Sequence, residues 1–293
     1  MASLVEIKKR IDSISSTIKV TKVMQMIATA KIAKIKQIVD VAKRYQDCAE
    51  NVFNSFLRYT SNKDEVSKYF KQKTTQKPSL YILFTSDKGT CGSINTNILK
   101  EMNNIIKANK NNNGVVILPI GKKADSFCKN YSTKENFEIF KTVNILTAEN
   151  CDSTQIAIVL KQVIKMYNRN EFNDICIVYN RYKNIITCNT TVEQVLPICK
   201  NKIQTQQSCN FTNIEETQTI SSSIIELYIR NVFYSAYVSN LASIISSRMN
   251  AMDNATKNGQ EIIDELRITY NKARQAKITS ELSDIVSGFE AIS

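Results

Sequence analysis

ISSSIIELYIRNVFYSAYVSNLASIISSRMNAMDNATKNGQEIIDEL, residues 220–266, indicates one long uninterrupted helix, because the segment holds no proline and a single glycine. Apolar residues, interrupted by Asn231, Arg248 and Gly259, recur along it at alternating steps of four and three, a spacing typical of a coiled-coil seam. The seam positions are Ile220, Ile224, Leu227, Asn231, Tyr234, Val238, Leu241, Ile245, Arg248, Met252, Ala255, Gly259, Ile262 and Leu266. The pattern predicts one helix that continues to Phe289, roughly 100 Å long at 1.5 Å per residue.

The first 77 residues show a second pattern of the same kind and contain neither glycine nor proline. Their apolar positions break phase near Thr21–Met24, which resembles a coiled-coil stutter. The predicted seam comprises Leu4, Ile7, Ile11, Ile14 and Ile18 before the slip, and Ile35, Ile38, Ala42, Tyr45, Ala49, Val52, Phe56 and Tyr59 after it. We expect a helix over 4–59, roughly 80 Å long, with a helix end and linker in 60–77.

The two long helices are expected to pair with each other in antiparallel orientation. All three prolines and four of the six glycines lie between residues 78 and 197, which predicts one compact domain there. A domain of that size is only about 30 Å across, so it cannot bury either stripe alone. The predicted domains are a first arm (1–77), a central domain (78–210) and a last arm (211–293), with net charges of +9, +6 and −3. Opposite charges on the arms favour their pairing.

The central domain alternates predicted strands and helices, which indicates a mainly parallel, Rossmann-like α/β sheet covered by helices. The predicted strands are 80–85, 115–120, 137–146, 175–182 and 185–196, the last two forming a hairpin that turns near Lys183–Asn184. The predicted helices are 95–109, 122–131 and 154–167. The fold class is therefore an antiparallel coiled coil of terminal helices with a central α/β domain.

Composition excludes several kinds of catalytic chemistry. The chain has no histidine, which rules out Ser-His-Asp and Cys-His relays and His-ligated metals. Its eight cysteines form no C-x-x-C pair and are interpreted as small buried hydrophobes of a reducing compartment. Neither a secretory signal nor an apolar run near 18 residues is found, so we expect a soluble chain without cofactor or metal.

A glycine-containing loop and four methionines each allow both a functional and a purely structural interpretation. The loop SDKGTCGS (86–93) follows a strand and opens a helix, where phosphate loops lie, but it lacks the spacing of either glycine motif. Gly89 and Gly92 are therefore expected to provide a tight turn and close helix–sheet packing, and Asp87 to cap the following turn. On the arms, Met24, Met26, Met249 and Met252 are interpreted as seam residues, with a sliding surface as the alternative.

The segment YNKARQAKITSEL (270–282), followed by DIVSG (284–288), resembles the C-terminal signature of the gamma subunit of rotary ATP synthases. Three further stretches agree with that family in order along the chain: KVMQMIA (22–28) with Lys31, the loop 86–93, and NLAS (240–243) continuing through Arg248, Met249, Met252, Ala255, Asn258 and Gly259. The matches span nearly the whole chain and are together highly specific.

The resemblance implies a non-catalytic rotor, the central stalk that couples proton-driven rotation to ATP synthesis. Its partners would be the alpha and beta subunits of the catalytic ring, epsilon/delta-type stalk subunits and the membrane c-ring, without nucleic acid. By similarity Arg274 and Gln275 would hydrogen-bond an acidic loop of a beta subunit. Lys272, Met24 and Lys22 would also contact a beta subunit. Asp87, Lys88, Gly89 and Gly92 would form a structural loop, and Ile285, Gly288 and Phe289 the shaft tip.

The chain departs from the family pattern at few positions. Lys88 stands where arginine is usual and loses its fork geometry, Thr90 replaces an apolar residue, Ser93 replaces glycine, and Phe289 replaces alanine. The cysteine-bearing insert of plastid gamma subunits is not evident, which argues against thiol regulation. Cysteine usage and richness in Lys, Asn and Ile favour the matrix side of a mitochondrial inner membrane, with a bacterial plasma membrane as the alternative.

Two other functions compete with this interpretation. An α/β ATPase with an inserted coiled coil would need a phosphate loop or a catalytic constellation, and the sequence offers neither. A basic coiled-coil scaffold for nucleic acid would use the net charge of +12, but no recognition motif accompanies that charge.

Overall fold

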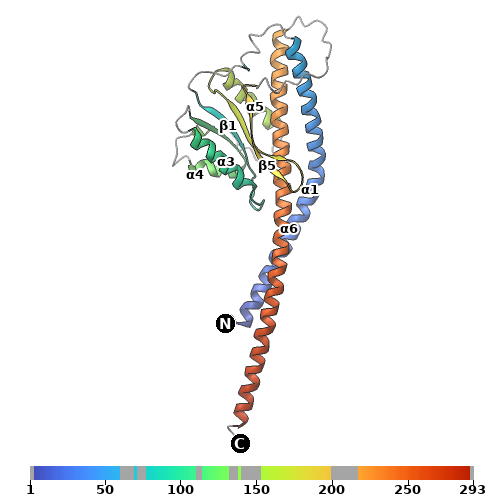
Figure 1. The fold of residues 1–293 in the computed structure, drawn as a ribbon, viewed down its shortest axis with the longest axis vertical. Coiled ribbons are helices and arrows are strands. Elements are labelled where there is room, and N and C mark those ends of the chain that lie inside the picture. Colours follow the sequence, from blue (N-terminus) through green and yellow to red (C-terminus); the bar gives the residue numbers. More distant parts are fainter. Residues whose placement is uncertain are drawn as a thin grey trace. The chain divides into compact units, whose positions relative to one another are not determined.

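The computed structural model describes residues 3–59, 69–70, 77–109, 114–131, 138–139, 153–198 and 217–290. Along the chain, one long helix precedes the α/β region and another follows it, as predicted (Figure 1). The elements are α1 (Leu4–Tyr59), β1 (Ser79–Phe84), α3 (Ile94–Ala108), β2 (Val115–Ile120), α4 (Lys122–Tyr131), β3 (Glu138–Ile139), α5 (Ser153–Asn168), β4 (Ile175–Tyr182), β5 (Cys188–Leu196) and α6 (Thr217–Glu290). Most of the linker predicted in 60–77, and residues 140–146 of the third predicted strand, lie outside the described residues.

Contacts divide the chain into two compact units, each treated separately below. The coiled-coil unit comprises 1–29 and 248–293, and the body unit comprises 30–247. The long helices are thus each shared between the two units. Neither they nor any other helix in the described ranges is both long and apolar enough to span a bilayer.

The body unit is built on a five-stranded sheet in the order β3-β2-β1-β4-β5. β1 pairs in parallel with both β2 and β4, and β5 pairs antiparallel with β4. The hairpin between β4 and β5 turns at Lys183–Asn184, as predicted. There the Asn184 Oδ1 accepts the backbone N–H groups of Ile186 and Thr187, at 3.0 and 2.6 Å. This Asx-type turn fixes the hairpin tip.

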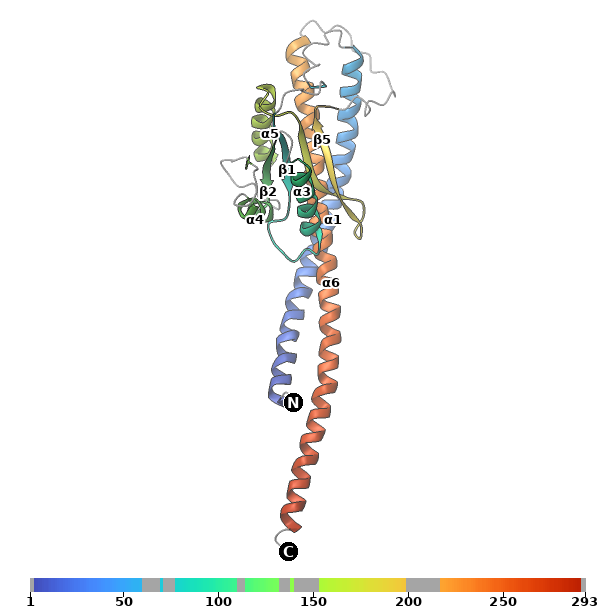
Figure 2. The same ribbon diagram turned by 60° about the vertical axis from the view of Figure 1, so that its left-hand side comes forward.

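Apolar residues cover both faces of the sheet, which gives the body three layers (Figures 1 and 2). On one face α3 and α4 pack through Ile98, Met102 and Cys128. On the other face α5, α6 and the body part of α1 share one larger core, in which Phe53 of α1 stacks on Tyr228 of α6 with ring centroids 4.4 Å apart. The long helices are therefore part of the body's core as well as partners of each other.

In the body part of α1, every second position of the predicted seam is exposed instead of buried. Ile38, Tyr45 and Val52 are 44%, 53% and 39% exposed, so their assignment to the seam was wrong. On this part of α1 the buried or half-buried positions that continue the seam are Ile35, Val39, Ala42, Gln46, Ala49, Phe53 and Phe56. These positions alternate steps of three and four, as the predicted seam does, so the spacing alone does not decide between Ile38 and Val39 or between Val52 and Phe53. On α6, Leu227 is likewise exposed rather than on the seam.

Candidate functional site

The coiled-coil unit pairs the start of α1 with the second half of α6 in antiparallel orientation, as expected. Thr21 Oγ1 lies 2.8 Å from Thr256 Oγ1, and Gln25 Nε2 donates to Asp253 Oδ1 at 2.9 Å. Residue numbers that rise along α1 meet residue numbers that fall along α6. The two hydrogen bonds therefore fix both the direction and the register of the pair.

The seam of this unit is continuous, and the predicted phase slip near Thr21–Met24 was wrong. Thr21 and Gln25 occupy seam positions themselves and continue the alternation of three and four. On α1 the buried or half-buried positions of that alternation are Leu4, Ile7, Ile11, Ile14, Ile18, Thr21, Gln25 and Ala28. On α6 they are Met249, Met252, Thr256, Gly259, Ile263, Leu266, Tyr270 and Ala273. Ala255 and Ile262, which were predicted on the seam, are exposed.

Gly259 lies where the two helices approach each other closely. A Cβ atom built there would be 2.8 Å from Ile18 Cγ1 and 3.1 Å from Ile18 Cδ1. A glycine inside a helix costs about 1 kcal/mol relative to alanine. Gly259 therefore lowers the local stability of α6 but allows close packing against Ile18. The prediction that Gly259 allows close approach on the seam is confirmed.

Apolar side chains also point outward from this unit. Val20, Val23, Met24 and Ile27 are exposed at the i, i+3, i+4, i+7 spacing of one helix face, which we call the α1 ridge. Met24 and Met26 are 41% and 57% exposed, so their interpretation as seam residues was wrong, whereas Met252 is 6% exposed and lies on the seam.

A second apolar stripe lies near the end of α6, at Ile278, Leu282, Ile285 and Val286. Every described side chain from Arg274 to Ser287 is exposed. This segment is a helix with an apolar side that the chain itself does not cover. Such a stripe normally marks a surface that another molecule covers.

The predicted contact residues fall into two groups along the coiled-coil unit. Lys22 and Met24 lie on α1 near the Gln25–Asp253 bond, and both side chains are exposed. Roughly 30 Å of helix separate Asp253 from Arg274, given 1.5 Å per residue. Arg274 and Gln275 are exposed there, and Lys272 lines a hollow at the start of α1 together with Glu6, Ile7, Arg10, Leu266, Thr269, Ala273 and Ala276.

The predicted tip residues are only partly described. Ile285 is exposed on the terminal stripe of α6. Gly288 and Phe289 belong to the last turn of α6, and the side chain of Phe289 lies outside the described residues.

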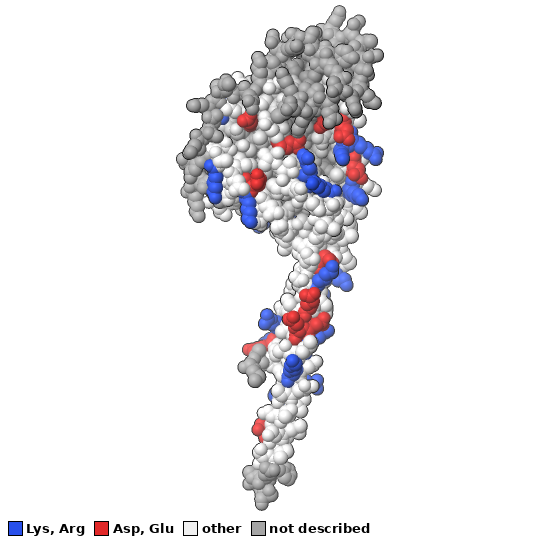
Figure 3. Space-filling view, in the orientation of Figure 1, with Lys and Arg blue, Asp and Glu red and all other residues white. Residues whose placement is uncertain are grey.

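Charged side chains of both signs line the coiled-coil unit (Figure 3). Lys257 pairs with Asp253 at 2.7 Å and Lys277 with Glu281 at 3.6 Å, each one turn apart on α6. Exposed pairs of this kind contribute little to stability. The hydrogen bond from Lys257, reinforced by its charge and by Gln25, lowers the pKa of Asp253 below its ordinary value. Asp253 therefore stays ionised and accepts the Gln25 amide at neutral pH.

The loop Ser86–Ser93 of the body unit directs its polar groups at the protein rather than outward to a ligand. Ser86 Oγ donates to Lys88 O at 2.6 Å, and Asn95 bonds both the backbone N–H and the hydroxyl of Ser86. Asp87 Oδ1 accepts the backbone N–H of Lys122 at 3.2 Å, so it caps the N-terminus of α4. These contacts favour the structural interpretation of the loop over a phosphate site.

The two glycines of this loop differ in their roles. Gly92 has φ +61°, and a Cβ there would lie 3.0 Å from Ser247 Oγ of α6, which agrees with the expected close packing. A Cβ at Gly89 would meet nothing within 4 Å, so close packing does not explain that glycine. Thr90, the departure from the family pattern, itself adopts the left-handed conformation at φ 57°, which is uncommon for a β-branched residue. Lys88 is exposed beside it.

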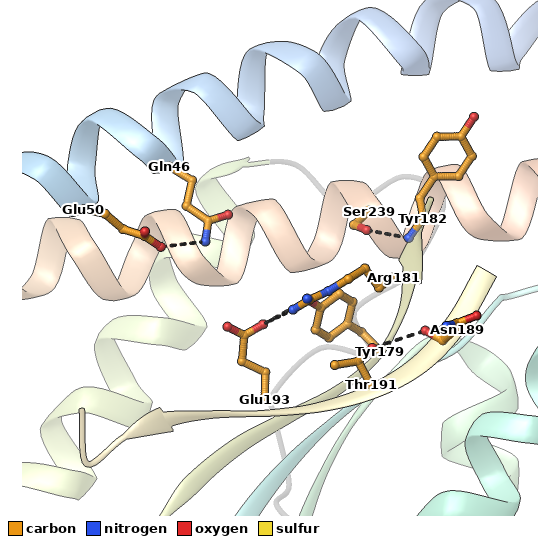
Figure 4. Close-up of polar contacts among 9 residues, drawn as sticks. All are labelled: Gln46, Glu50, Tyr179, Arg181, Tyr182, Asn189, Thr191, Glu193 and Ser239. Atoms are coloured by element: carbon orange, nitrogen blue, oxygen red, sulfur yellow. Dashed lines mark hydrogen bonds and ion pairs between the residues drawn. The ribbon is translucent and has the colours of Figure 1, made fainter. Parts of the chain in front are cut away.

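Sequence reasoning missed a polar network on β4 and β5 (Figure 4). The Tyr179 hydroxyl donates to Glu193 Oε2 at 2.9 Å and accepts from Arg181 Nε and Nη2 at 3.1 and 2.9 Å. Arg181 also pairs with Glu193 at 3.1 Å. Burial, aided by the Glu193 charge, raises the pKa of Tyr179 to about 12, so the phenol keeps its proton at physiological pH. We interpret the network as structural.

Comparisons with known proteins agree with this architecture. A family model described as ATP synthase matches residues 3–292. The ATP synthase gamma chain of Pelagibacter ubique is 33% identical over the whole length of both chains, and that of Fusobacterium nucleatum is 30% identical, also over both whole chains. The chain belongs to the ATP synthase gamma chain family. It is thus a non-catalytic central-stalk subunit, as the resemblance implied.

Solved structures of this family share the fold. A chain of the Tetrahymena thermophila mitochondrial ATP synthase central stalk and c-ring is 26% identical, with a TM-score of 0.58 over 80% of this chain and 99% of that one. A chain of the Euglena gracilis mitochondrial enzyme is 19% identical, with a TM-score of 0.65 over 99% and 94%, which supports the fold alone.

The close approach at Gly259 gives a first prediction. We expect Gly259→Ala to lower the free energy of unfolding of the chain by about 1–2 kcal/mol, because overpacking against Ile18 outweighs the gain in helix propensity. The measurement is urea unfolding followed by ellipticity at 222 nm. In an Ile18→Ala background the same change should be neutral or stabilising. A higher unfolding midpoint for Gly259→Ala alone would contradict the packing argument.

Proposed function

We propose that this central-stalk subunit rotates within a ring of alpha and beta subunits and couples proton-driven rotation of a c-ring to the catalytic cycle of the beta subunits. The observation that carries the proposal is the coiled-coil unit, with its two uncovered apolar surfaces, the α1 ridge and the terminal stripe of α6. Contiguous exposed apolar surface on a soluble protein marks an interface.

The coupling follows from the asymmetry of two paired helices. Two helices cannot present the same surface to three equivalent sites around them. Each beta subunit therefore meets a different surface, and contacts that differ between conformations shift the equilibrium of each site. As the stalk turns, each site passes in sequence through binding of ADP and phosphate, formation of ATP and its release.

The partners of the body unit follow from the related assemblies. The solved Tetrahymena structure contains the central stalk and c-ring, and the Euglena structure contains OSCP, F1 and the c-ring. By analogy we assign the body to the foot of the stalk, against epsilon/delta-type subunits and the c-ring. The coiled-coil unit then extends into the ring of alpha and beta subunits.

Within the coiled-coil unit we propose two levels of contact with beta subunits. Met24 of the α1 ridge and Lys22 beside it form one level, and Lys272, Arg274 and Gln275 form the other. The planar fork of Arg274 can hold a carboxylate through two parallel hydrogen bonds, which suits an acidic loop of a beta subunit. Ile285, Gly288 and Phe289 form the tip inside an apolar bearing of the ring, and Asp87, Lys88, Gly89 and Gly92 form a structural loop of the body.

Replacement of Arg274 tests this role. In the assembled enzyme Arg274→Ala should lower the rate of ATP synthesis roughly tenfold at unchanged assembly, because a charge-assisted hydrogen bond contributes about 1.5–3 kcal/mol. Arg267→Ala is a matched control, since Arg267 is exposed on the same helix and already pairs with Asp264 at 3.5 Å. Synthesis by Arg274→Ala at the rate of the control would overturn the assignment.

We further propose that the complex lies at the mitochondrial inner membrane, on the matrix side. The support is the eight cysteines and the richness in Lys, Asn and Ile. The chain should co-fractionate with inner-membrane markers and resist protease in intact mitochondria. Recovery with a bacterial plasma membrane would support the alternative instead.

A further inference from the structure

Strand β4 extends beyond the strand that pairs with it. β1 pairs with β4 only from Leu80–Ile175 to Leu83–Val178, whereas β4 continues to Tyr182. On its other side β4 is paired with β5 throughout. We call residues 179–182 the overhang of β4. On the side where β1 would continue, the backbone N–H and C=O groups of this overhang have no strand partner. Asn180, in the middle of this overhang, is 2% exposed, so water cannot satisfy them.

Helix α6 supplies the missing partners from its side chains. Asn240 Oδ1 accepts the backbone N–H of Asn180 at 3.1 Å, and Ser243 Oγ lies 3.0 Å from Asn180 O, to which it can donate. Ser239 Oγ accepts the backbone N–H of Tyr182 at 2.9 Å (Figure 4). The helix thus takes the place of a strand at this edge, and its acceptors and donors match the spacing of alternate β4 residues.

Two neighbouring loops are held by the next turn of α6. Ser246 Oγ donates to Ile185 O at the tip of the β4–β5 hairpin. Ser247 Oγ donates at 2.6 Å to Cys91 O in the loop that contains Gly92. Asn240, Ser243 and Ser246 are at most 1% exposed, so these bonds lie in a dry interior. We call Ser239, Asn240, Ser243, Ser246 and Ser247 the polar clamp.

The clamp differs physically from the apolar core that also joins α6 to the sheet. Apolar contact is non-directional, so it fixes the rotation and axial position of a helix only through the fit of side-chain shapes. Hydrogen bonds require defined distances and angles, so bonds to three separate backbone segments fix both the rotation and the axial position of α6. Serine and asparagine are short, so little side-chain freedom is lost in forming them.

We infer that the polar clamp is the torque joint of this subunit. It locks α6 to the body, so that rotation imposed on the body passes into α6 without slip. This inference rests on the proposed rotor function, because only a rotor needs a joint that resists twisting. Removal of the clamp leaves the apolar core and the fold in place but makes the joint compliant.

The first test measures the joint directly in the assembled complex. Asn240→Ala and Ser239→Ala should each speed hydrogen exchange of one amide, that of Asn180 and of Tyr182 respectively, by at least about tenfold, because the amide loses its acceptor. Ser235→Ala on the same helix is the matched control and should leave both amides unchanged. Equal exchange in all variants would overturn the clamp as a structural joint.

The second test asks whether the joint carries torque. In a Ser243→Ala/Ser246→Ala/Ser247→Ala variant, ATP-driven proton pumping per ATP hydrolysed should fall at least about twofold against an imposed proton gradient, with hydrolysis itself retained. If exchange accelerates but the pumping ratio stays at the Ser235→Ala value, the torque role is overturned and the clamp only stabilises the fold. The rotor proposal stands in that case, since its own test is the Arg274→Ala variant.

A covalent replacement of the clamp provides a third test. A Cβ at Gly92 would lie 3.0 Å from Ser247 Oγ, which suits a disulfide in a Gly92→Cys/Ser247→Cys variant. Oxidised and reduced forms of the same variant are compared, so any strain at Gly92 is common to both. The oxidised form should pump at least as well per ATP as the reduced form. A loss of pumping on oxidation would show that the joint must move, which would overturn the inference.

Discussion

Each long helix carries an apolar stripe that the α/β domain is too small to cover, so the stripes of α1 and α6 must largely bury each other. This constraint makes the helices antiparallel, since both are joined to the same domain. It also explains why the contacts at the seam are specific rather than merely apolar. The approach at Gly259 and the Thr21–Thr256 and Gln25–Asp253 bonds select one register among those a simple apolar seam would allow.

The same pairing leaves other apolar surface exposed. The α1 ridge and the terminal stripe of α6 lie on faces that the two helices cannot bury against each other. An enzyme would normally cover such surface or use it to build a pocket. A stalk presents it to the subunits around it, which is consistent with the family to which the chain belongs.

The order and type of the elements could be predicted from the sequence, because glycine and proline are confined to the middle and the periodicity of each segment is clear. The phase of the seam was harder to predict. Thr21 and Gln25 of α1 form hydrogen bonds with Thr256 and Asp253 of α6. A search for apolar residues passes over such polar seam positions and places a phase slip there. Beside Ile38, Tyr45 and Val52, the residue that follows each is the one that is buried or half-buried. The spacing of three and four fits either choice, so only the packing of the folded chain decides between them.

The clamp was out of reach of sequence reasoning for a different reason. From the sequence alone, a serine or asparagine on the buried face of a helix is expected to lower stability, because its hydrogen-bond partner is not known. Here the partners are backbone groups of β4 and of two loops. These hydrogen bonds are needed because β4 extends beyond its pairing with β1, which only the folded sheet reveals. The contacts proposed for Arg274 and Gln275 rest on the family resemblance, since nothing in their exposed positions identifies a partner.

The central claim is that α1 and α6 form one fixed antiparallel pair throughout the working cycle. The most direct measurement is ATP synthesis by an assembled Thr21→Cys/Thr256→Cys enzyme before and after oxidation, with disulfide formation followed on non-reducing gels. The hydroxyl oxygens of these residues are 2.8 Å apart, so the disulfide should form readily. The oxidised enzyme should make ATP at the rate of the reduced one. Failure to form the disulfide, or loss of synthesis that reduction restores, would contradict a pair that turns as a single body.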